Sequence, residues 1–350
     1  MLENLTISGL PPYKSISITS SAEEAVRTAS IVLVPEGDGV SVAPGKAVTI
    51  KAGGDVLLTG YVRDVQPRHD AVDRSLTVTV CSRTVDATEC SVDHPTGEIL
   101  QKDLAAIAKE FDGLGIGIES DGSLPIEPRH KLRVGETLFA TIERRARGRG
   151  ILIYDTPQGR LKLATKPEGT HSGGLIWGVN IEQASSSITE RGRYSSVKVR
   201  GQASEGTEKQ QMRPEARARD AGVTRKRPLI IPHEGEVMID RMKTRADWQV
   251  KRGAGYAATA SIVTTGWRDG GGRIWTRNWL VLVRDAWIGI DGMMVIKSVT
   301  LEQDSANGGA GTTATLSLAD PRALGGENPR GKTSDAYAAP GAITPEYEDQ

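Results

Sequence analysis

Alternating apolar and polar residues recur through the first ninety residues of the chain. The pattern predicts short strands at residues 15–19 and 31–34, and two further strands around a Gly-Gly-Asp turn at 53–55. The stretch SLTVTVCSR alternates cleanly as well, which predicts a strand at 75–83. We therefore expect a small, mostly antiparallel β domain at the start of the chain.

One helix is expected inside this first domain. Ser20 with Glu23, or Ser21 with Glu24, has the spacing of a capping box, in which a hydroxyl and a carboxylate satisfy free amides at a helix start. The sequence predicts that a helix begins there and connects the first two strands.

The pattern changes to a helical period after Pro95. The stretch LQKDLAAIAKEFDG places apolar residues on one stripe and ends in Gly113, and ETLFATIERRARGRG repeats that pattern. The stretch ILIYDTPQGRLKLAT then predicts a hairpin around residues 157–159. Two helices and a hairpin indicate a compact α+β unit.

Strand patterns return at SSVKVRGQ and continue to Asp320. Residues 203–227 are polar and are predicted to form a mobile surface loop. A short strand, PLIIP, and a helix at about 237–252 come next, followed by four antiparallel strands in ASIVTTGW, RIWTRNWLVLV, MMVIKSVTLEQ and TTATLSLAD. The remainder, rich in Gly, Pro, Ala and charge, is predicted to be a flexible tail.

These patterns predict an α+β fold that is mostly antiparallel β. Two β domains, each with one helix, flank a smaller α+β domain. The expected boundaries are 1–95 for the first β domain, 96–178 for the α+β domain, 179–322 for the second β domain, and 323–350 for the tail.

Composition narrows the class of protein. The 44 basic residues equal the 44 acidic ones, so overall charge indicates neither specific nucleic-acid binding nor attraction to an anionic membrane. The longest apolar runs, such as WLVLV, are too short to cross a bilayer, and the first residues do not have the pattern of a signal peptide. With 2 cysteines, no disulfide framework is expected.

One string, GENPRGKT, matches the phosphate-binding loop of nucleotide hydrolases. Gly326, Gly331, Lys332 and Thr333 occupy the defining positions. Such a loop needs a buried parallel strand before it and a helix after it. Here prolines stand on both sides and the string lies near the end of the chain, so we interpret the match as chance and predict no bound cofactor.

Metal binding and catalysis lack intact patterns. Cys81, Cys90 and His94 could hold a metal, but eight residues separate the two cysteines and no second ligand pair exists. The 5 histidines lie in polar, turn-like sequence, and no serine lies in a Gly-x-Ser-x-Gly elbow. We predict no metal site, no catalytic residues and no enzyme activity.

Two arginine-rich segments, 143–150 and 213–228, raise the question of a nucleic-acid surface. Trp267, Trp275 and Trp279 follow and could stack on bases. The balanced net charge favours solvated arginines instead, with the tryptophans on a hairpin face or at a subunit contact.

The ordered blocks resemble one family, the baseplate hub protein of Mu-like contractile-tailed phages. The resemblance covers about residues 1–322 and is carried by the following stretches: VTIKAGGDVLLTGYVRDV, LTVTVCSRTVDATECSVDH, GETLFATIERRARGRGILIYDTPQGRLKL, RYSSVKVRGQ, RKRPLII, RADWQVKR, GWRDGGGRIWTRNWLVLV and MMVIKSVTLEQD. Relatives often carry Gly at the position of Cys81 and Leu-Val in place of Ala87-Thr88. These departures further weaken a role for the cysteines.

The resemblance implies a structural role at the tip of a phage tail. It implies a homotrimeric ring with two tube-like β domains per subunit, which matches the sixfold tail tube on one side and the threefold central spike on the other. The implied partners are other copies of the chain, the spike and the tail tube or distal tube protein, with wedge and tape measure proteins as further candidates. The implied location is the virion baseplate, after synthesis in the host cytoplasm. A glycan-binding or glycan-cleaving tail protein remains the alternative, since the C-terminal half is rich in β-strand, Gly and Trp.

Overall fold

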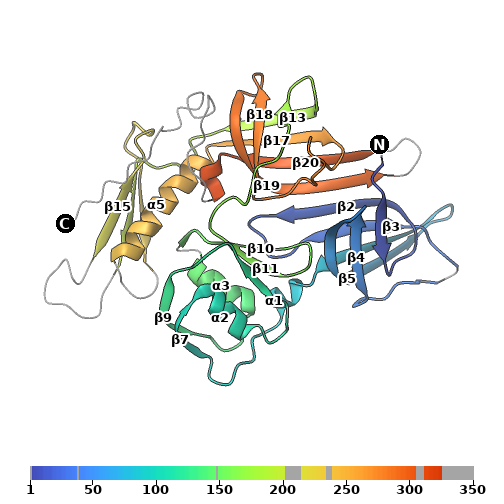
Figure 1. The fold of residues 1–350 in the computed structure, drawn as a ribbon, viewed down its shortest axis with the longest axis horizontal. Helices are drawn as coiled ribbons and strands as arrows, with labels where there is room; N and C mark the ends of the chain where they lie inside the picture. Colours follow the sequence, from blue (N-terminus) through green and yellow to red (C-terminus); the bar gives the residue numbers. More distant parts are fainter. Residues whose placement is uncertain are drawn as a thin grey trace.

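The computed structural model describes residues 2–37, 39–146, 149–201, 214–233, 239–304 and 311–324. Antiparallel strands dominate it, as the sequence predicts, and a helical unit and a small sheet with its own helix complete it (Figure 1). The predicted fold class, α+β with mostly antiparallel strands, is confirmed.

The first β half consists of strands from the first eighty-two residues. They are β1 (Leu5–Ser8), β2 (Tyr13–Ser21), β3 (Thr28–Leu33), β4 (Ala47–Ala52), β5 (Asp55–His69) and β6 (Arg74–Ser82). Their spatial order is β1-β4-β5-β6-β3-β2. Leu76, Val78 and Val80 on β6 are buried as their alternation predicts, because successive side chains of a strand point to opposite faces.

The second β half continues the same sheet. Its strands are β12 (Leu175–Ile176), β13 (Ile181–Ile188), β17 (Ala258–Thr265), β18 (Leu280–Asp285), β19 (Ile290–Asp304) and β20 (Thr312–Ala319). Strand β2 pairs with β19, from Ser15 opposite Asp304 to Ser21 opposite Ser298, so the two halves form one 12-stranded sheet. One apolar cluster extends through both halves, and Ile31 and Leu316 are members of it.

The α+β unit has an apolar cluster of its own. Its elements are α1 (Val85–Glu89), β7 (Glu98–Asp103), α2 (Leu104–Phe111), β8 (Ile118–Ser120), β9 (Ile126–Lys131), α3 (Leu138–Ala146), β10 (Leu152–Asp155) and β11 (Leu161–Ala164). Asp103 caps α2, since its carboxylate accepts from the backbone N–H of Ala106 at 2.8 Å. The predicted stripe of α2 is buried against α3 and the neighbouring strands. The two predicted helices and the predicted hairpin are thus present.

The last unit is a three-stranded sheet covered by a long helix. It consists of β14 (Ser196–Arg200), β15 (Glu215–Arg219), β16 (Pro228–Pro232) and α5 (Ile239–Gly255). Met242, Ala246 and Val250 of α5 pack on Val197 and Val199 of β14. The predicted helix is therefore present, but it covers this small sheet.

The helix predicted at Ser20 is wrong. Strand β2 extends to Ser21 because its backbone pairs with β19, and the N–H of Ala22 then donates to the carbonyl of Lys297 at 2.8 Å. The Ser21 hydroxyl accepts from the N–H of Glu23 within a tight turn. The local capping pattern does not produce a helix here, because long-range strand pairing satisfies the backbone N–H and C=O groups instead.

The loop predicted at 203–227 is wrong for its second part. Residues 215–219 form β15, which pairs antiparallel with β14 and buries Ala216 and Ala218. The alternation EARAR is a strand pattern in which alanine supplies the apolar face. Residues 202–213 lie outside the described residues.

The first two residues of the predicted tail, Ala323 and Leu324, are part of the fold. Residues Pro321–Leu324 form a 3-10 helix, η2, and Ala323 and Leu324 are buried. A side chain at Gly255 of α5 would lie 2.2 Å from the backbone nitrogen of Ala323, so glycine is required for this approach. Residues 325–350 lie outside the described residues.

Candidate assembly site

A buried ion cluster, here named the junction network, joins three parts of the fold. It consists of Asp155 at the end of β10, Arg27 before β3 and Arg277 before β18. Arg277 Nη2 lies 2.6 Å from Asp155 Oδ1, and Arg27 Nε lies 3.4 Å from Asp155 Oδ2. All three side chains are buried. The α+β unit is thereby tied to both β halves.

Backbone and neighbouring groups extend the junction network. Arg277 Nη2 also donates to the backbone oxygen of Asp155, and Arg27 Nη1 donates to the backbone oxygen of Leu57. Next to them, Asn278 Nδ2 donates to the Tyr154 hydroxyl at 3.0 Å. These bonds fix the relative placement of β10 and the segment before β18, which the sequence separates widely.

Glu23 forms a second connection. Its carboxylate accepts from Arg252 Nη2 and from the Tyr256 hydroxyl, each at 2.6 Å, and lies 3.6 Å from Lys297 Nζ. Burial raises the pKa of Glu23, but the Tyr256 hydroxyl and the two cations outweigh it and hold that pKa below its ordinary value. The turn after β2, the end of α5 and β19 meet at this one side chain.

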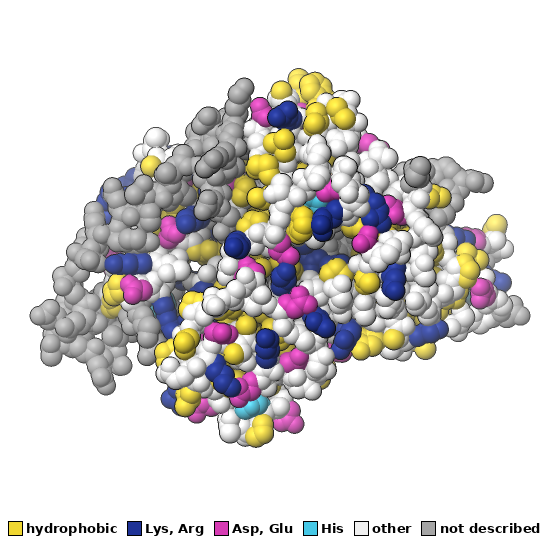
Figure 2. All heavy atoms as spheres, in the orientation of Figure 1, with side chains coloured by type: hydrophobic (Ala, Val, Ile, Leu, Met, Phe, Trp, Pro, Cys, Tyr) yellow, Lys and Arg dark blue, Asp and Glu magenta, His cyan; other side chains and the backbone are white. Residues whose placement is uncertain are grey.

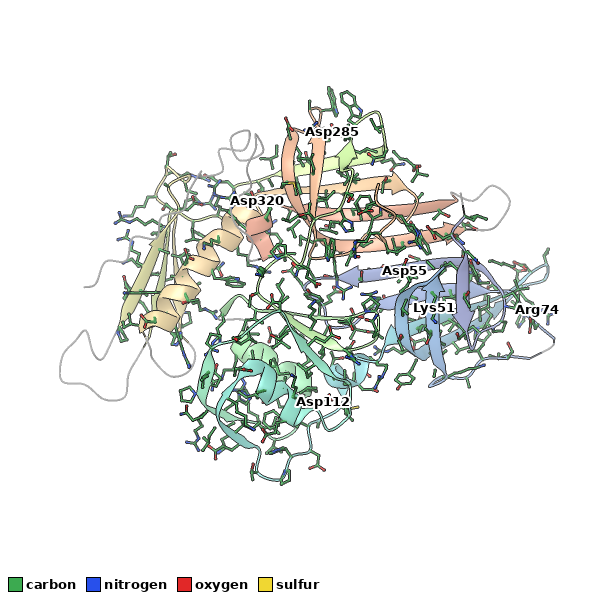
Figure 3. The ribbon with its side chains drawn as sticks, in the orientation of Figure 1. Lys51, Asp55, Arg74, Asp112, Asp285 and Asp320 are labelled. Carbon is green, nitrogen blue, oxygen red and sulfur yellow. The ribbon has the colours of Figure 1, made fainter. Side chains whose placement is uncertain are left out.

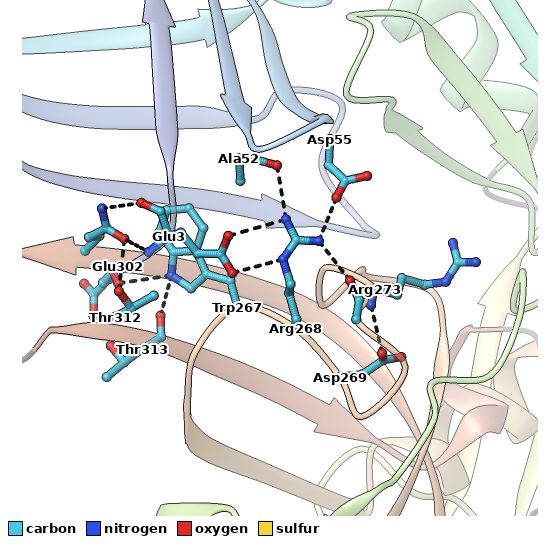
Figure 4. Close-up of polar contacts among 12 residues, drawn as sticks. Glu3, Ala52, Asp55, Trp267, Arg268, Asp269, Arg273, Glu302, Thr312 and Thr313 are labelled. Carbon is cyan, nitrogen blue, oxygen red and sulfur yellow. Dashed lines mark hydrogen bonds and ion pairs between the residues drawn. The ribbon is translucent and has the colours of Figure 1, made fainter. Parts of the chain in front are cut away.

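Arg268 fastens the first residues of the chain to the second β half (Figure 4). Its Nε lies 3.0 Å from Glu3 Oε1, and its Nη1 lies 2.7 Å from Asp55 Oδ2. The neighbouring indole of Trp267 is fully buried and donates to the backbone oxygens of Glu302 and Thr313. Both side chains therefore serve packing and alignment of the sheet.

His171 resembles one part of a catalytic dyad but has no free nitrogen. Its Nδ1 lies 2.8 Å from Asp269 Oδ2, and its Nε2 accepts from the backbone N–H of Thr276 at 3.1 Å. Burial lowers the pKa of His171 although Asp269 acts in the opposite direction. The ring packs between Trp275 and Trp279 and is closed to solvent. The expectation of turn-like, polar surroundings is wrong for this histidine and for His130, which is buried in β9.

The residues considered as metal ligands do not converge. Cys81 is buried in β6, where burial raises the pKa of its thiol, and Cys90 is exposed after α1. His94 accepts from the Gly97 N–H at 3.1 Å and packs edge-on against Phe111. Within the described part of the chain, no three His, Cys, Asp or Glu side chains are grouped closely enough to hold a metal ion.

The residues of the phosphate-loop match cannot be placed. Gly326, Gly331, Lys332 and Thr333 lie outside the described residues.

Each arginine-rich segment contains described arginines that pair with carboxylates. Arg144 contacts Glu136 through Nε at 3.1 Å and Nη2 at 3.0 Å, and Arg227 lies 2.9 Å from Glu190. Trp267 and Trp275 are buried in the core. These rings are therefore not available for base stacking.

An exposed apolar surface lies at the tip of the β18–β19 hairpin. We name it the hairpin-tip patch; it consists of Trp177, Val179 and Trp287, whose exposed fractions are 60%, 76% and 85%. The backbone N–H of Trp177 donates to the oxygen of Arg284 at 3.0 Å, which places residues 177–179 beside this hairpin. Figure 2 shows hydrophobic side chains gathered at this end of the molecule. Large exposed apolar residues that gather in one place indicate a contact surface.

Asp285 holds the turn that presents Trp287. Its Oδ1 accepts from the N–H of Trp287 at 3.0 Å and from the N–H of Ile288 at 3.3 Å, and the carboxylate is buried (Figure 3). The exposed indole therefore projects from a fixed turn. A turn whose backbone is fixed in this way loses little conformational entropy when it binds a partner.

Strand β13 adjoins the hairpin-tip patch. The Ser186 hydroxyl donates to the backbone oxygen of Ile288 at 2.9 Å, and among the described strands β13 pairs only with β17. Most of its residues are exposed. Strand β1 is the edge at the other end of the sheet path. Unpaired edges of this kind are templates for pairing with another chain.

The hairpin-tip patch is not among the features predicted from the sequence. Its signal was available, since Trp287 lies in the turn sequence DAWIGID and Trp177 in LIWGVN, where glycine follows closely. A tryptophan in a turn is far from the apolar core and is seldom buried there, so such residues are candidates for exposed contact sites.

No described helix is long and apolar enough to span a membrane.

Two family models match the chain. Residues 239–327 match the fourth domain of Mu phage baseplate assembly protein GpP, and residues 84–165 match the second domain of baseplate hub protein gp44-like. The second match begins at the residue before α1 and ends with the residue after β11. Both matches are to baseplate proteins.

Individual relatives agree with these matches. The chain is 27% identical over 285 residues to baseplate hub protein gp44 of Escherichia phage Mu, covering 77% of this chain and 75% of that protein. The crystal structure of the prophage MuSo2 43 kDa tail protein from Shewanella oneidensis has a TM-score of 0.77 and 29% identity, covering 91% of this chain and 98% of that one.

A second solved structure has the same fold at lower identity. It is the tail protein from Neisseria meningitidis MC58, with a TM-score of 0.75, 16% identity and coverage of 93% of this chain and 99% of that one. The ordered blocks, the family models and the fold agree, and the chain is thus a relative of the baseplate hub proteins of Mu-like contractile-tailed phages, as its sequence predicts.

Proposed function

We propose that the chain forms a homotrimeric ring at the phage tail tip that adapts the sixfold tail tube to the threefold central spike. The relationship to baseplate hub and tail proteins supports a structural role in the baseplate. Each subunit would contribute its two β halves, so that three subunits present six β units around a channel. The domain boundaries predicted from the sequence are part of this proposal.

The observation that carries the proposal is the pair of edge strands at the two ends of one continuous sheet, as the described residues form it. Strand β1 ends the sheet path on one side and β13 on the other, and the hairpin-tip patch lies beside β13. Two different edges favour a head-to-tail contact, in which one edge of a subunit meets the other edge of the next. Such a contact generates a closed ring when the rotation per subunit closes.

The proposed role needs no catalysis. The buried His171 has both ring nitrogens engaged, and no described group of side chains is arranged to hold a metal. We propose that the protein is not an enzyme. The glycan-directed alternative gains no support from the exposed tryptophans, because Trp177 and Trp287 lie on a hairpin tip and not in a cleft.

The proposed partners follow from the ring. They are other copies of the chain, the central spike and the tail tube or distal tube protein, and wedge and tape measure proteins are further candidates. The proposed location is the baseplate of the virion, after synthesis in the host cytoplasm. We propose neither specific nucleic-acid binding nor stable membrane insertion.

The test is the mass of the purified chain in solution, measured by light scattering and native mass spectrometry. A trimer of the 37.4 kDa chain is expected at micromolar concentration, with a ring of threefold symmetry in negative-stain images. Val179→Ser should weaken the trimer, because Val179 belongs to the hairpin-tip patch. Val72→Ser should leave the trimer unchanged, because the exposed Val72 lies in the turn between β5 and β6 and is not part of that patch. A monomer for the unmodified chain across this concentration range would contradict the proposal.

A further inference from the structure

A cavity lies where the two β halves and the α+β unit meet. Its volume is about 380 Å³, and its walls come from the segments around β2, the β4–β5 turn, the β10–β11 turn and residues 273–277. Three arginines line it, namely Arg27, Arg273 and Arg277, together with the polar side chains of Ser20, Gln158 and Thr276. The volume is sufficient for a small polyatomic ion with a few water molecules.

The buried charges beside this cavity do not balance. Arg27 and Arg277 are 7% and 3% exposed, and a single carboxylate, Asp155, lies between them. Burial lowers the pKa of Arg27 to about 10, Asp155 counteracts this only partly, and Arg277 lowers it further. A buried positive charge without a full counterion is unfavourable, which makes this place attractive to an anion.

Nearby acidic residues do not remove the imbalance. Asp55 also lines the cavity, but its side chain is 57% exposed to solvent, and it shares Arg268 with Glu3. Arg277 lies over the Tyr154 ring at 5.0 Å, which compensates its charge only weakly. Among the described residues, the buried Nε atoms of Arg27 and Arg277 have no hydrogen-bond partner.

Arg273 adds a third cation at this cavity. It is exposed, its guanidinium lies 4.5 Å from the centre of the Trp279 ring, and it forms no ion pair with a described residue. It lines the same cavity as the two buried arginines. Guanidinium groups bind oxyanions through parallel N–H donors, which a point charge does not provide.

We propose that this cavity is a binding site for a small tetrahedral oxyanion, phosphate or sulfate, held by Arg27, Arg273 and Arg277. Ser20, Gln158 and Thr276 supply further hydrogen-bonding groups to the bound ion. The walls of the cavity belong to three parts of the fold. A bound anion would therefore stabilise the contacts between these parts, and it could dissociate again. A ligand that binds only the folded chain also stabilises it by mass action.

The experiment is calorimetric titration of the full chain with sodium phosphate, with sodium chloride at equal ionic strength as the reference. Arg273→Gln is the test variant, since its exposed side chain can be changed without disturbing the buried pair. Arg63→Gln is the matched control, because Arg63 is exposed, pairs with Glu89 and does not line the cavity. Thermal unfolding of each protein in phosphate and in chloride gives an independent measurement.

Saturable phosphate binding is expected for the unmodified chain and for Arg63→Gln. Arg273→Gln should bind about tenfold more weakly, the effect of one charge-assisted contact. The melting temperature should rise in phosphate above its value in chloride, and the rise should be smaller for Arg273→Gln. Absence of saturable binding, or equal binding by the two variants, would overturn the proposal. Because both outcomes are read on the chain in any assembly state, they are separate from the test of the ring.

Discussion

Gly60 on β5 and Cys81 on β6 approach each other so closely that a side chain on Gly60 would lie 1.8 Å from the Cys81 carbonyl oxygen. The two strands bulge between Val62 and Asp64, immediately after this point. Only a hydrogen atom fits between them, so the position selects glycine for its size.

We therefore expect Gly60→Ala to destabilise the chain by about 3 kcal/mol, the upper part of the usual range for overpacking. Urea denaturation followed by tryptophan fluorescence measures the change. Gly54→Ala is the matched control, because nothing lies within 4 Å of an added side chain there. Equal stability of the two variants would show that the strands separate without cost.

Asp155→Ala should be more damaging than the loss of an ordinary ion pair. It leaves Arg27 and Arg277 buried without their shared carboxylate, and removing one member of a buried pair costs about 3–5 kcal/mol. The measurement is the free energy of unfolding in urea.

Glu89→Ala is the control for this change. It breaks the pair with Arg63, in which both side chains are about half exposed, and should cost less than about 1 kcal/mol. If the Asp155 variant lost no more stability than this control, the junction network would not be what holds the three parts together.

His130 makes stability depend on pH. It is buried in β9, its Nε2 lies 2.9 Å from the Thr141 hydroxyl, and burial together with Arg144 and Arg145 lowers its pKa to about 4. A group whose pKa is lower in the folded chain favours the unfolded chain when it is protonated. The contribution of neutral His130 to the free energy of unfolding is complete above the ordinary pKa near 6.5. It is lost progressively as the pH falls to about 4.

The expected loss from His130 between pH 7 and pH 4 is about 3 kcal/mol. Unfolding in urea at a series of pH values measures it, and His130→Gln should lose this part of the pH dependence. The exposed His69→Gln should keep it. An unchanged slope in the His130 variant would assign the pH dependence to other groups.

The regular strands and helices were largely predictable from the sequence, because their apolar period is strong. Strand β6 and helix α2 each bury the stripe that their period predicts. Strand β13 has the sequence IEQASSSI and escaped prediction, since an exposed edge needs no apolar alternation. The helix at Ser20 was predicted wrongly because the local sequence contains a helix-capping pattern. The pairing of β2 with the distant strand β19, which forms instead, cannot be recognised from that local sequence.

The side chains that join the units were not predictable by pattern. Arg27, Asp155 and Arg277 are far apart in the sequence, and each has an ordinary local context. His171 likewise depends on Asp269, ninety-eight positions later, for its hydrogen bond. Only the fold brings such partners together, so residue type and spacing gave no signal.

Asp285 and Asp112 provide a matched pair for the last prediction. Each carboxylate accepts from two backbone N–H groups, of Trp287 and Ile288 for Asp285, and of Ile116 and Gly117 for Asp112 (Figure 3). Replacing either by Ala should cost about 1–3 kcal/mol, because hydrogen bonds to a charged acceptor are lost. Only Asp285 holds the turn that presents Trp287 in the hairpin-tip patch.

If that patch contacts a neighbouring subunit, Asp285→Ala should weaken self-association while Asp112→Ala should not. The expected change is at least tenfold in the concentration at which the oligomer dissociates, since a large aromatic side chain at a contact contributes 2 kcal/mol or more in typical cases, roughly a factor of thirty. Sedimentation velocity over a dilution series measures the dissociation, and urea denaturation confirms that the two variants lose similar stability. Equal dissociation of both variants would place the subunit contact away from the hairpin-tip patch.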